Sequence, residues 1–243
     1  DISCLVGSEM CIRDRHKLNR GTMQAALAAL LLVLDAGGRC PRPEAVIRLR
    51  SILDRWKQDH RWLTGNDDYP MAAMHATRDV SVESLGLEVE QIYQTLASAR
   101  FRKGEQLQLA THILACGDIG PHEAAGRFAG VARQLRERGE RIWTTMYDEI
   151  AMLAVSGIPE GDAAGRVLAY RDRLREVKPK PTAAMAFSIA AGAVLGEEAE
   201  RVEGLEGTAE VAGLHSVQAM IAAQQAAMVA SIAAVTVVAT SGS

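Results

Sequence analysis

Apolar residues recur every three or four positions through most of the chain, which is the pattern of amphipathic helices. The segment PEAVIRLRSILDRWKQDH shows it clearly. Its proline suits a first helical turn, and its core spacings are filled by Val46, Ile47, Leu49, Leu53 and Trp56. Aromatic residues make up only 4% of the chain and alanine is abundant, which favours close packing of helices over a β-sandwich or a doubly wound sheet.

The predicted helices alternate in length and charge. Longer, charged helices are each followed by a shorter helix that is almost uncharged. We predict the longer helices over residues 44–60, 81–100, 121–139 and 159–177, and the shorter ones over 68–77, 105–116, 145–156 and 182–195. The uncharged stretch from Met23 to Leu34 is expected to be the shorter helix of a preceding, incomplete unit.

This alternation indicates an internal repeat. Aligning the shorter helices places Tyr69, Leu107 and Tyr147 in register, with a period of roughly 40 residues. Such periods are typical of stacked helical hairpins, which bury their apolar faces against their neighbours. We therefore predict an all-α, α-solenoid-like fold of stacked antiparallel hairpins. A compact, irregular helical bundle is the structural alternative.

The end of the chain changes in character. The helical-repeat domain is expected over residues 16–196, and the acidic, glycine-containing residues 197–216 are expected to be a linker. Residues 217–240 are uncharged and rich in alanine, so we predict a C-terminal helix there. Its length suits a membrane span, but it contains paired glutamines and lacks flanking Lys or Arg clusters. We expect it to dock on its own domain or on a second copy.

Charge and motifs exclude several classes of function. The formal net charge is -3, and the basic clusters are interleaved with acids, so we expect solvated helix faces and no nucleic-acid partner. The cysteines form no CxxC or zinc-like spacing, and the chain has no secretory leader pattern, so a cytoplasmic protein is expected. Nucleotide-binding GxGxxG and GxxxxGK[ST] motifs and the GxSxG elbow are absent.

The most conspicuous polar cluster is the segment Asn66-Asp67-Asp68-Tyr69-Pro70. Adjacent carboxylates can share a hard cation or act as an acid and a base. The proline, however, marks the first turn of a helix, where an aspartate is a good N-cap. Threonines at comparable positions of the other units (Thr144, Thr145 and Thr182) favour the capping interpretation.

His112 lies in the nearly uncharged segment QLATHILA. A lone histidine there can be a ligand or a general base. In the repeat alignment it matches Met74 and Met152, which are ordinary packing residues, so we favour a partly buried, hydrogen-bonded core histidine. The chain contains no HxxxH or HExxH spacing.

Polar groups on the shorter helices define one candidate site. If these helices line a single surface, their polar side chains converge on a groove between repeats. The candidate binding residues are Asp67, Asp68, Tyr69, His112, Tyr147 and Asp148. We assign no catalytic residue, no metal ligand and no cofactor.

Four segments in order resemble a known family. TGNDDYPMAAM, QLQLATHILA, TMYDEIAMLA and VQAMIAAQQAAMVASIAA together look like a bacterial family known only as a domain of unknown function, numbered 4003. The resemblance covers most of residues 20–240. It implies that the Asp-Asp-Tyr-Pro box and His112 belong to a family pattern, and it brings no activity, substrate or cofactor with it.

The first residues require a separate explanation. Residues 1–15 resemble the translated end of a transposase-based sequencing adapter, so we expect them to be a disordered artefact. Members of the resembled family usually have further helices before the matched region. Together these features indicate an N-terminally truncated metagenomic fragment, with Cys40 and Cys116 as its native cysteines.

Three functions are compatible with this sequence. The first is a non-enzymatic repeat scaffold that binds a protein or peptide on the groove lined by the shorter helices. The second is a metal-dependent enzyme or binder that uses the Asp-Asp-Tyr-Pro box and His112. The third is a membrane-associated protein anchored by its C-terminal tail. The missing catalytic spacings favour the scaffold.

Overall fold

The computed structural model describes residues 23–117, 119–176, 178 and 180–203. This part of the chain is all-α, with nine α-helices, two short 3₁₀ helices and no strand. The predicted adapter-derived residues 1–15, most of the predicted linker and the predicted helix over 217–240 lie outside the described residues. The self-association expected of that last helix therefore stays a prediction.

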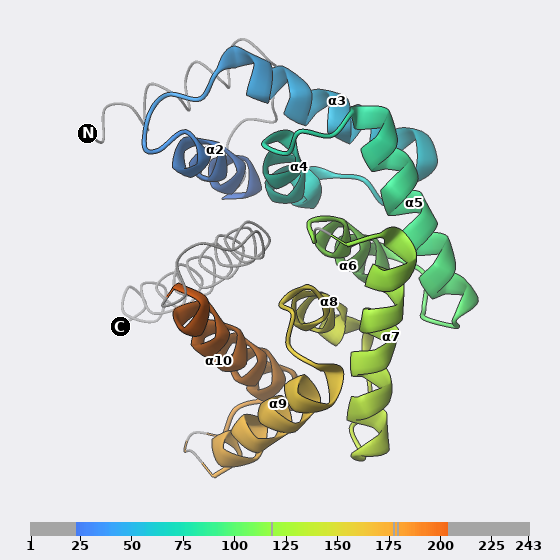
Figure 1. Ribbon diagram of the computed structural model, residues 1–243, viewed down its shortest axis with the longest axis vertical. Coiled ribbons are helices and arrows are strands. Elements are labelled where there is room, and N and C mark those ends of the chain that lie inside the picture. Colours follow the sequence, from blue (N-terminus) through green and yellow to red (C-terminus); the bar gives the residue numbers. More distant parts are fainter. Residues whose placement is uncertain (1–22, 118, 177, 179, 204–243) are drawn as a thin grey trace, which may run out of the picture.

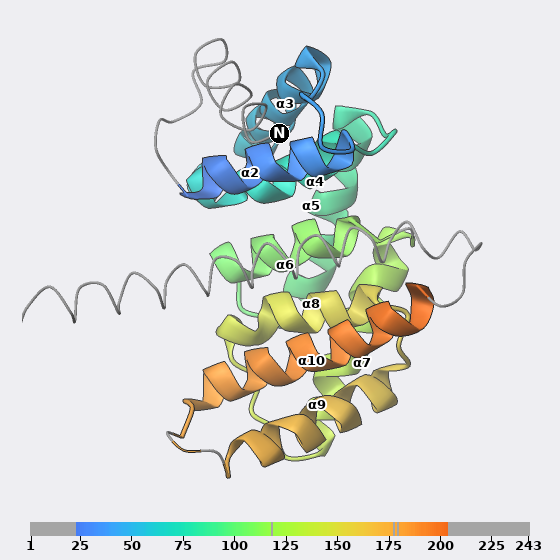
Figure 2. The ribbon, with the colours of Figure 1, turned by 90° about the vertical axis from the view of Figure 1, so that its left-hand side faces the viewer.

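The helices form two layers (Figures 1 and 2). The inner layer, as Figure 1 shows, holds the shorter helices with α10, and the outer layer holds the longer ones. The inner helices are α2 (Met23–Asp35), α4 (Tyr69–Ala76), α6 (Glu105–Ala115), α8 (Tyr147–Val155) and α10 (Ala183–Glu203). The outer helices are α3 (Pro43–Asp59), α5 (Val82–Ser98), α7 (Pro121–Glu137) and α9 (Glu160–Leu174). The 3₁₀ helices η1 (Asn66–Asp68) and η2 (Thr144–Met146) precede α4 and α8.

Each layer is built from neighbours in chain order. In the inner layer α2 packs on α4, α4 on α6, α6 on α8 and α8 on α10, and in the outer layer α3 packs on α5, α5 on α7 and α7 on α9. The two layers meet where each outer helix packs on the inner helix that follows it, as α3 does on α4. The described helices therefore bury their apolar surface mainly against helices that are one or two places away in chain order.

Local sequence explains where the helices begin. Pro43 and Pro121 occupy first-turn positions of α3 and α7, where the missing N–H of proline costs nothing. The Ser81 hydroxyl accepts the N–H of Ser84 at 3.0 Å and caps α5. Inner helices α4, α6 and α8 are buried almost all round, as expected of helices that are apolar on every face. The predicted helix ends agree with the structure within three residues, except at the end of α10.

Helix α10 extends beyond its predicted end at residue 195. Residues 197–203, which we expected to begin a linker, are helical. Arg166 of α9 binds both Glu197 (2.7 Å) and Glu198 (3.2 Å), and Ala199 is buried. The acidic residues that indicated a linker thus face a basic partner from a different helix.

Candidate functional site

Asp68 and His112 lie next to each other, as the predicted groove requires. Asp68 ends η1 and His112 lies near the end of α6, with Asp68 Oδ1 and His112 Nε2 3.6 Å apart. That separation is too long for a direct hydrogen bond. His112 is 1% exposed, and neither of its ring nitrogens has a hydrogen-bond partner among the described residues. The predicted burial of His112 is confirmed, whereas its predicted hydrogen bond is wrong.

Three further side chains close a polar cluster around this pair. The ring of Trp56, from α3, stacks on the His112 ring with centroids 3.7 Å apart. Gln108 lies one helical turn before His112 and donates its Nε2 proton to Thr64 Oγ1 at 3.0 Å. Gln108 Oε1 and Trp56 Nε1 are buried without a partner in the described structure. We call Trp56, Thr64, Asp68, Gln108 and His112 the polar cluster. It joins α3, its connection to α4, and α6.

Burial decides the charges in the polar cluster. It raises the pKa of Asp68 to about 6, the charges of Asp67 and Glu105 add to the rise, and the N–H of Gly65 opposes it. Burial also lowers the pKa of His112 well below its ordinary value. At neutral pH the pair is therefore a carboxylate beside an uncharged imidazole. The pair therefore buries one charge instead of two, and it forms neither an ion pair nor a direct hydrogen bond.

The capping interpretation of Asp68 needs a correction. Asp68 precedes α4, but its carboxylate makes no bond to the first turn of that helix. It turns back and accepts the N–H of Gly65 at 2.8 Å, which fixes η1 instead. Thr144 also makes no side-chain cap, whereas Thr182 Oγ1 accepts the N–H of Met185 at 3.2 Å as predicted.

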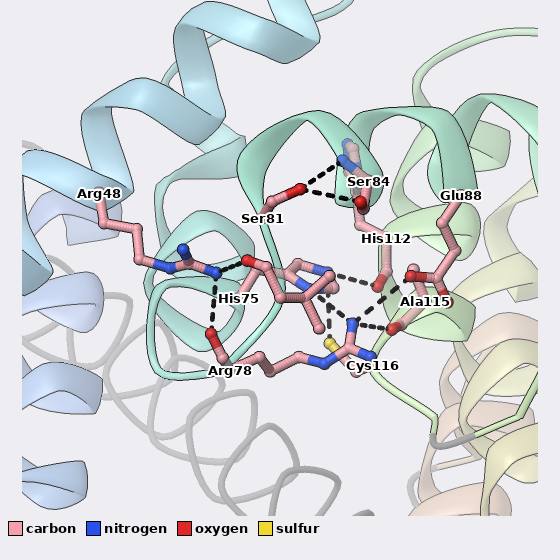
Figure 3. Close-up of polar contacts among 10 residues, drawn as sticks. Arg48, His75, Arg78, Ser81, Ser84, Glu88, His112, Ala115 and Cys116 are labelled. Atoms are coloured by element: carbon pink, nitrogen blue, oxygen red, sulfur yellow. Dashed lines mark hydrogen bonds and ion pairs between the residues drawn. The ribbon is translucent and has the colours of Figure 1, made fainter.

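His75 links α4 to α6 beside the polar cluster (Figure 3). Its Nε2 lies 2.9 Å from the carbonyl oxygen of His112. A carbonyl oxygen only accepts hydrogen bonds, so Nε2 carries the proton and Nδ1 is the acceptor. Arg78 supplies a proton to Nδ1 at 3.4 Å and also donates to the carbonyl oxygen of Ala115. Arg48 of α3 donates to the carbonyl oxygen of Arg78 at 2.8 Å, which ties the outer layer to the same network.

Cys116 lies 3.4 Å from His75 Nε2, a pairing that in other proteins activates a nucleophilic thiol. Here burial raises the pKa of the Cys116 thiol to about 12 and lowers the pKa of His75 to about 3. His75 Nε2 already carries a proton that it donates to the His112 carbonyl oxygen, so it cannot accept the thiol proton. The contact is therefore a neutral link between α4 and the end of α6.

The remaining predicted residues lie in different surroundings. Asp67 is exposed and accepts a hydrogen bond from Gln24 of α2 at 2.7 Å, and Tyr69 is half-buried against the core. Tyr147 is buried with Phe101 and Phe128, and its hydroxyl accepts the N–H of Arg102 at 3.1 Å. The structure thus pairs Asp68 with His112 and places Tyr147 in a separate aromatic cluster.

Asp148 is half-buried beside Glu149, a buried carboxyl group that we had not proposed as a site residue. Glu149 Oε1 accepts a hydrogen bond from the Ser188 hydroxyl of α10, while Oε2 is buried without a partner in the described structure. Burial and the neighbouring Asp148 raise the pKa of Glu149 to about 8. Glu149 therefore joins α8 to α10 mainly as an uncharged acid.

Replacing Glu149 by glutamine is expected to remove a pH-dependent loss of stability. Because the folded-state pKa is raised from 4.5 to about 8, the folded protein binds more protons than the unfolded chain between these values. The free energy of unfolding therefore falls as pH rises through this window. We expect the free energy of unfolding of Glu149→Gln, relative to that of the wild type, to be up to about 4 kcal/mol higher at pH 9 than at pH 5, since a tenfold change in proton affinity corresponds to about 1.4 kcal/mol.

Urea unfolding of both proteins at pH 5 and pH 9 measures this difference. The matched control is Glu200→Gln, because it also removes one carboxyl group from an inner helix, in this case from an exposed position of α10. If the free energies of unfolding of Glu149→Gln and the wild type differ by the same amount at both pH values, Glu149 is ionised in the folded protein.

The protein has a surface hollow of about 620 Å³. It is bounded by Arg138 after α7, by the connection from α8 to α9, and by parts of α9 and α10. Its lining includes Arg138, Arg166, Arg201, Asp162, Glu198 and the glycines Gly157, Gly161 and Gly165. None of the six predicted site residues lines it. Arg166 is already bound by Glu197 and Glu198, so this basic group is partly neutralised.

The described residues show neither a metal-ligand group nor a membrane-spanning helix. In the part of the chain that the structure covers, no three His, Cys, Asp or Glu side chains lie close enough together to hold a metal ion. Over the same residues, no helix has the length and apolar character that a membrane crossing requires.

Sequence reasoning missed five of the residues that build this region. Trp56 was predicted only as a core residue, and Thr64, Gln108, Cys116 and Glu149 were given no role. Polar residues inside otherwise uncharged helices are the one signal that marks Gln108 and Glu149. Their partners come from other helices, and no local pattern identifies those.

Comparison with known proteins places the chain within a family. The family model described as "Protein of unknown function (DUF4003)" matches residues 19–226. The chain is also 26% identical over 209 residues to a protein of Bacillus subtilis (strain 168) described as "Uncharacterized protein YeaA". That alignment covers 85% of this chain and 61% of the Bacillus protein, so the chain spans about three fifths of its relative. No solved structure matches the chain.

Proposed function

Since the chain belongs to the DUF4003 family, whose description assigns no function, we propose from its structure that it is a helical-repeat scaffold. In this proposal the helix pairs are units of an α-solenoid, and another protein binds along the inner layer. The carrying observation is that helices of each layer pack on their neighbours in chain order. Extended stacks of this kind present continuous surfaces, which repeat proteins use to bind partners.

The chemistry of the inner layer supports an apolar helix as the bound segment. Helices α2, α4 and α6 carry a single acid each at most and no Lys or Arg, and α10 is uncharged as far as residue 196. Exposed apolar side chains are present at both ends of this layer, with Leu34 on α2 and Met185 on α10. An amphipathic helix that lays its apolar face on such a surface loses no charge solvation.

The buried polar groups support a scaffold more than an enzyme. The polar cluster is shut between helices, and the Cys116–His75 pair is neutral at ordinary pH. These groups connect one unit to the next, as His75 does between α4 and α6. Their shared effect is to fix the relative position of the units, on which a rigid binding surface depends.

Site-specific photo-cross-linking tests the proposal. A photoreactive amino acid at Leu34 or Met185, in the inner layer, is expected to capture the same protein in bacterial cells. The matched controls are Ile47 and Leu87, which are exposed to a similar extent but belong to the outer layer. The purified partner is then expected to bind Met185→Glu about tenfold more weakly than Ile47→Glu, a loss typical of a charge placed in an apolar contact.

Equal capture from the outer positions would contradict an inner-layer surface. Capture from neither layer would contradict the scaffold function.

A further inference from the structure

The connections from outer to inner helices gather basic residues that the sequence shows only as scattered positions. These connections are residues 60–65, 99–104, 138–143 and 175–182. They contain nine Lys and Arg residues and two acids. The basic residues are Arg61, Arg100, Arg102, Lys103, Arg138, Arg141, Arg175, Lys178 and Lys180, and the acids are Glu140 and Glu176. All nine basic side chains are exposed.

These four connections share one edge of the molecule. The inner helices begin at the same side of the stack, which is the left side of Figure 2. Contacts between successive units agree with this arrangement. Thr64 of the first connection forms a hydrogen bond with Gln108 at the start of α6. Arg102 of the second connection forms one with Tyr147 at the start of α8. Glu140 of the third connection forms an ion pair with Arg171 near the end of α9. We call the nine basic residues, with Trp62 and Trp143, the basic edge.

The connections at the opposite edge are nearly neutral. Residues 36–42, 77–81, 116–120 and 156–159 carry three arginines and two aspartates. One of those arginines, Arg78, is bound into the His75 network. The basic edge is therefore a property of one side of the stack, while the whole chain has a net charge of -3.

Few carboxylates neutralise the basic edge. Glu140 is bound to Arg171, and Arg175 lies 3.3 Å from Asp172. Glu176 of the fourth connection is exposed, as are Asp67 and Glu105 in the first turns of the adjoining inner segments, and Asp67 is held by Gln24. Among described residues, no carboxylate forms an ion pair with eight of the nine bases: Arg61, Arg100, Arg102, Lys103, Arg138, Arg141, Lys178 and Lys180.

Two tryptophans interrupt the charges. Trp62 is 92% exposed and Trp143 is 51% exposed, and the guanidinium group of Arg141 lies over the Trp143 ring at 3.8 Å. Trp and Arg are among the residues most enriched at binding hot spots.

We propose that the basic edge binds an extended, acidic segment of a partner protein; the inference rests on the scaffold function proposed above. Neighbouring helices lie about 10 Å apart, so successive connections are separated by about that distance. An extended peptide advances about 3.3 Å per residue, so acids at every third position meet successive connections. The acidic charge of the rest of the molecule repels a long polyanion, which favours a short acidic peptide over a nucleic acid.

Fluorescence anisotropy with the purified full chain tests this assignment. The probe is a labelled twelve-residue peptide with glutamate at every third position, and a twelve-nucleotide single-stranded RNA is the second probe. The double variant Arg102→Glu/Arg141→Glu reverses two charges at the basic edge. Its matched control is Arg39→Glu/Arg42→Glu, which reverses two exposed arginines at the opposite edge.

We expect the edge variant to bind the peptide at least about tenfold more weakly than the wild type, and the control within about twofold. Peptide binding should also weaken as salt screens the charges. Equal losses in both variants, or an absence of peptide binding by the wild type, would overturn the proposal. RNA binding tighter than peptide binding and lost in the edge variant would overturn it in favour of a nucleic acid.

Cross-linking from the inner layer and peptide binding, both measured on the wild-type chain, separate this inference from the scaffold function. If Leu34 and Met185 capture a partner but the chain does not bind the peptide, the edge inference alone has failed. If neither inner position captures a partner, the scaffold function has failed.

Discussion

Replacing Trp56 by alanine is expected to lower the free energy of unfolding by about 3 to 5 kcal/mol, the range measured for truncating a large buried aromatic side chain. Trp56 is 2% exposed and stacks on His112, and its ring also lies edge-on to His75 at 5.7 Å. The truncation therefore leaves a cavity beside two buried imidazoles. It also removes one of the contacts of the outer helix α3 with the inner helices α4 and α6.

Trp62→Ala is the matched control, because it removes the same side chain from a position that is 92% exposed. Its effect on the free energy of unfolding should stay within about 0.5 kcal/mol. Urea denaturation followed by far-ultraviolet circular dichroism compares the two variants without relying on tryptophan fluorescence. Similar losses for both would show that Trp56 does not fill the core between the layers.

Phe128→Ala is expected to have a loss of similar size, about 3 to 5 kcal/mol. Phe128 of α7 is fully buried between Phe101, at 4.9 Å, and Tyr147, at 5.7 Å between ring centroids. Phe101 lies in the connection between α5 and α6, and Tyr147 is the first residue of α8. The conservative Phe128→Leu keeps most of the volume and should cost about 1.5 kcal/mol or less. Equal losses from both variants, measured by the same denaturation, would contradict this account of the aromatic contacts.

The helices could be predicted because local signals determine them. The prolines at residues 43 and 121 and the cap at Ser81 mark helix starts, and apolar spacing such as that of Leu49, Leu53 and Trp56 marks the buried faces. The all-α class follows from the same signals. These features depend on neighbours within one or two turns, which a sequence shows directly.

The tertiary partners of polar groups could not be predicted in the same way. Glu197 and Glu198 indicated a linker, because the sequence does not show that Arg166 lies opposite them across a helix pair. His112 was expected to have a hydrogen bond, but its ring is held by stacking on Trp56. In both cases the outcome depends on which helix faces which, and that is decided by packing between layers.

The basic edge was hidden for a related reason. Arg102, Arg141 and Lys178 are separated in the sequence by helices that carry both acids and bases, so each cluster seemed to be part of a mixed, solvated face. Stacking places the connections side by side and the helices between them on other surfaces. The charge asymmetry of this protein therefore becomes visible only when the charged residues of the connections at each edge are counted together.

The prediction that polar side chains of the shorter helices come within reach of one another holds for Asp68 and His112, and both side chains are buried. Asp68 and His112 meet, as proposed, because η1 and α6 adjoin each other in the stack. Tyr147 begins α8 and faces Phe101 and Phe128 instead. Residues at comparable positions of the inner helices need not face one another, since each contacts its own neighbours.

Hydrogen exchange of the Phe128→Ala variant, followed by mass spectrometry, tests the proposed solenoid most directly. If the units depend only on their neighbours, the amides of α7 and α8 should lose protection, while those of α2, α3 and α4 should exchange at wild-type rates. Loss of protection by the same factor in every helix would contradict the account, because it would mean that the chain folds around a single shared core.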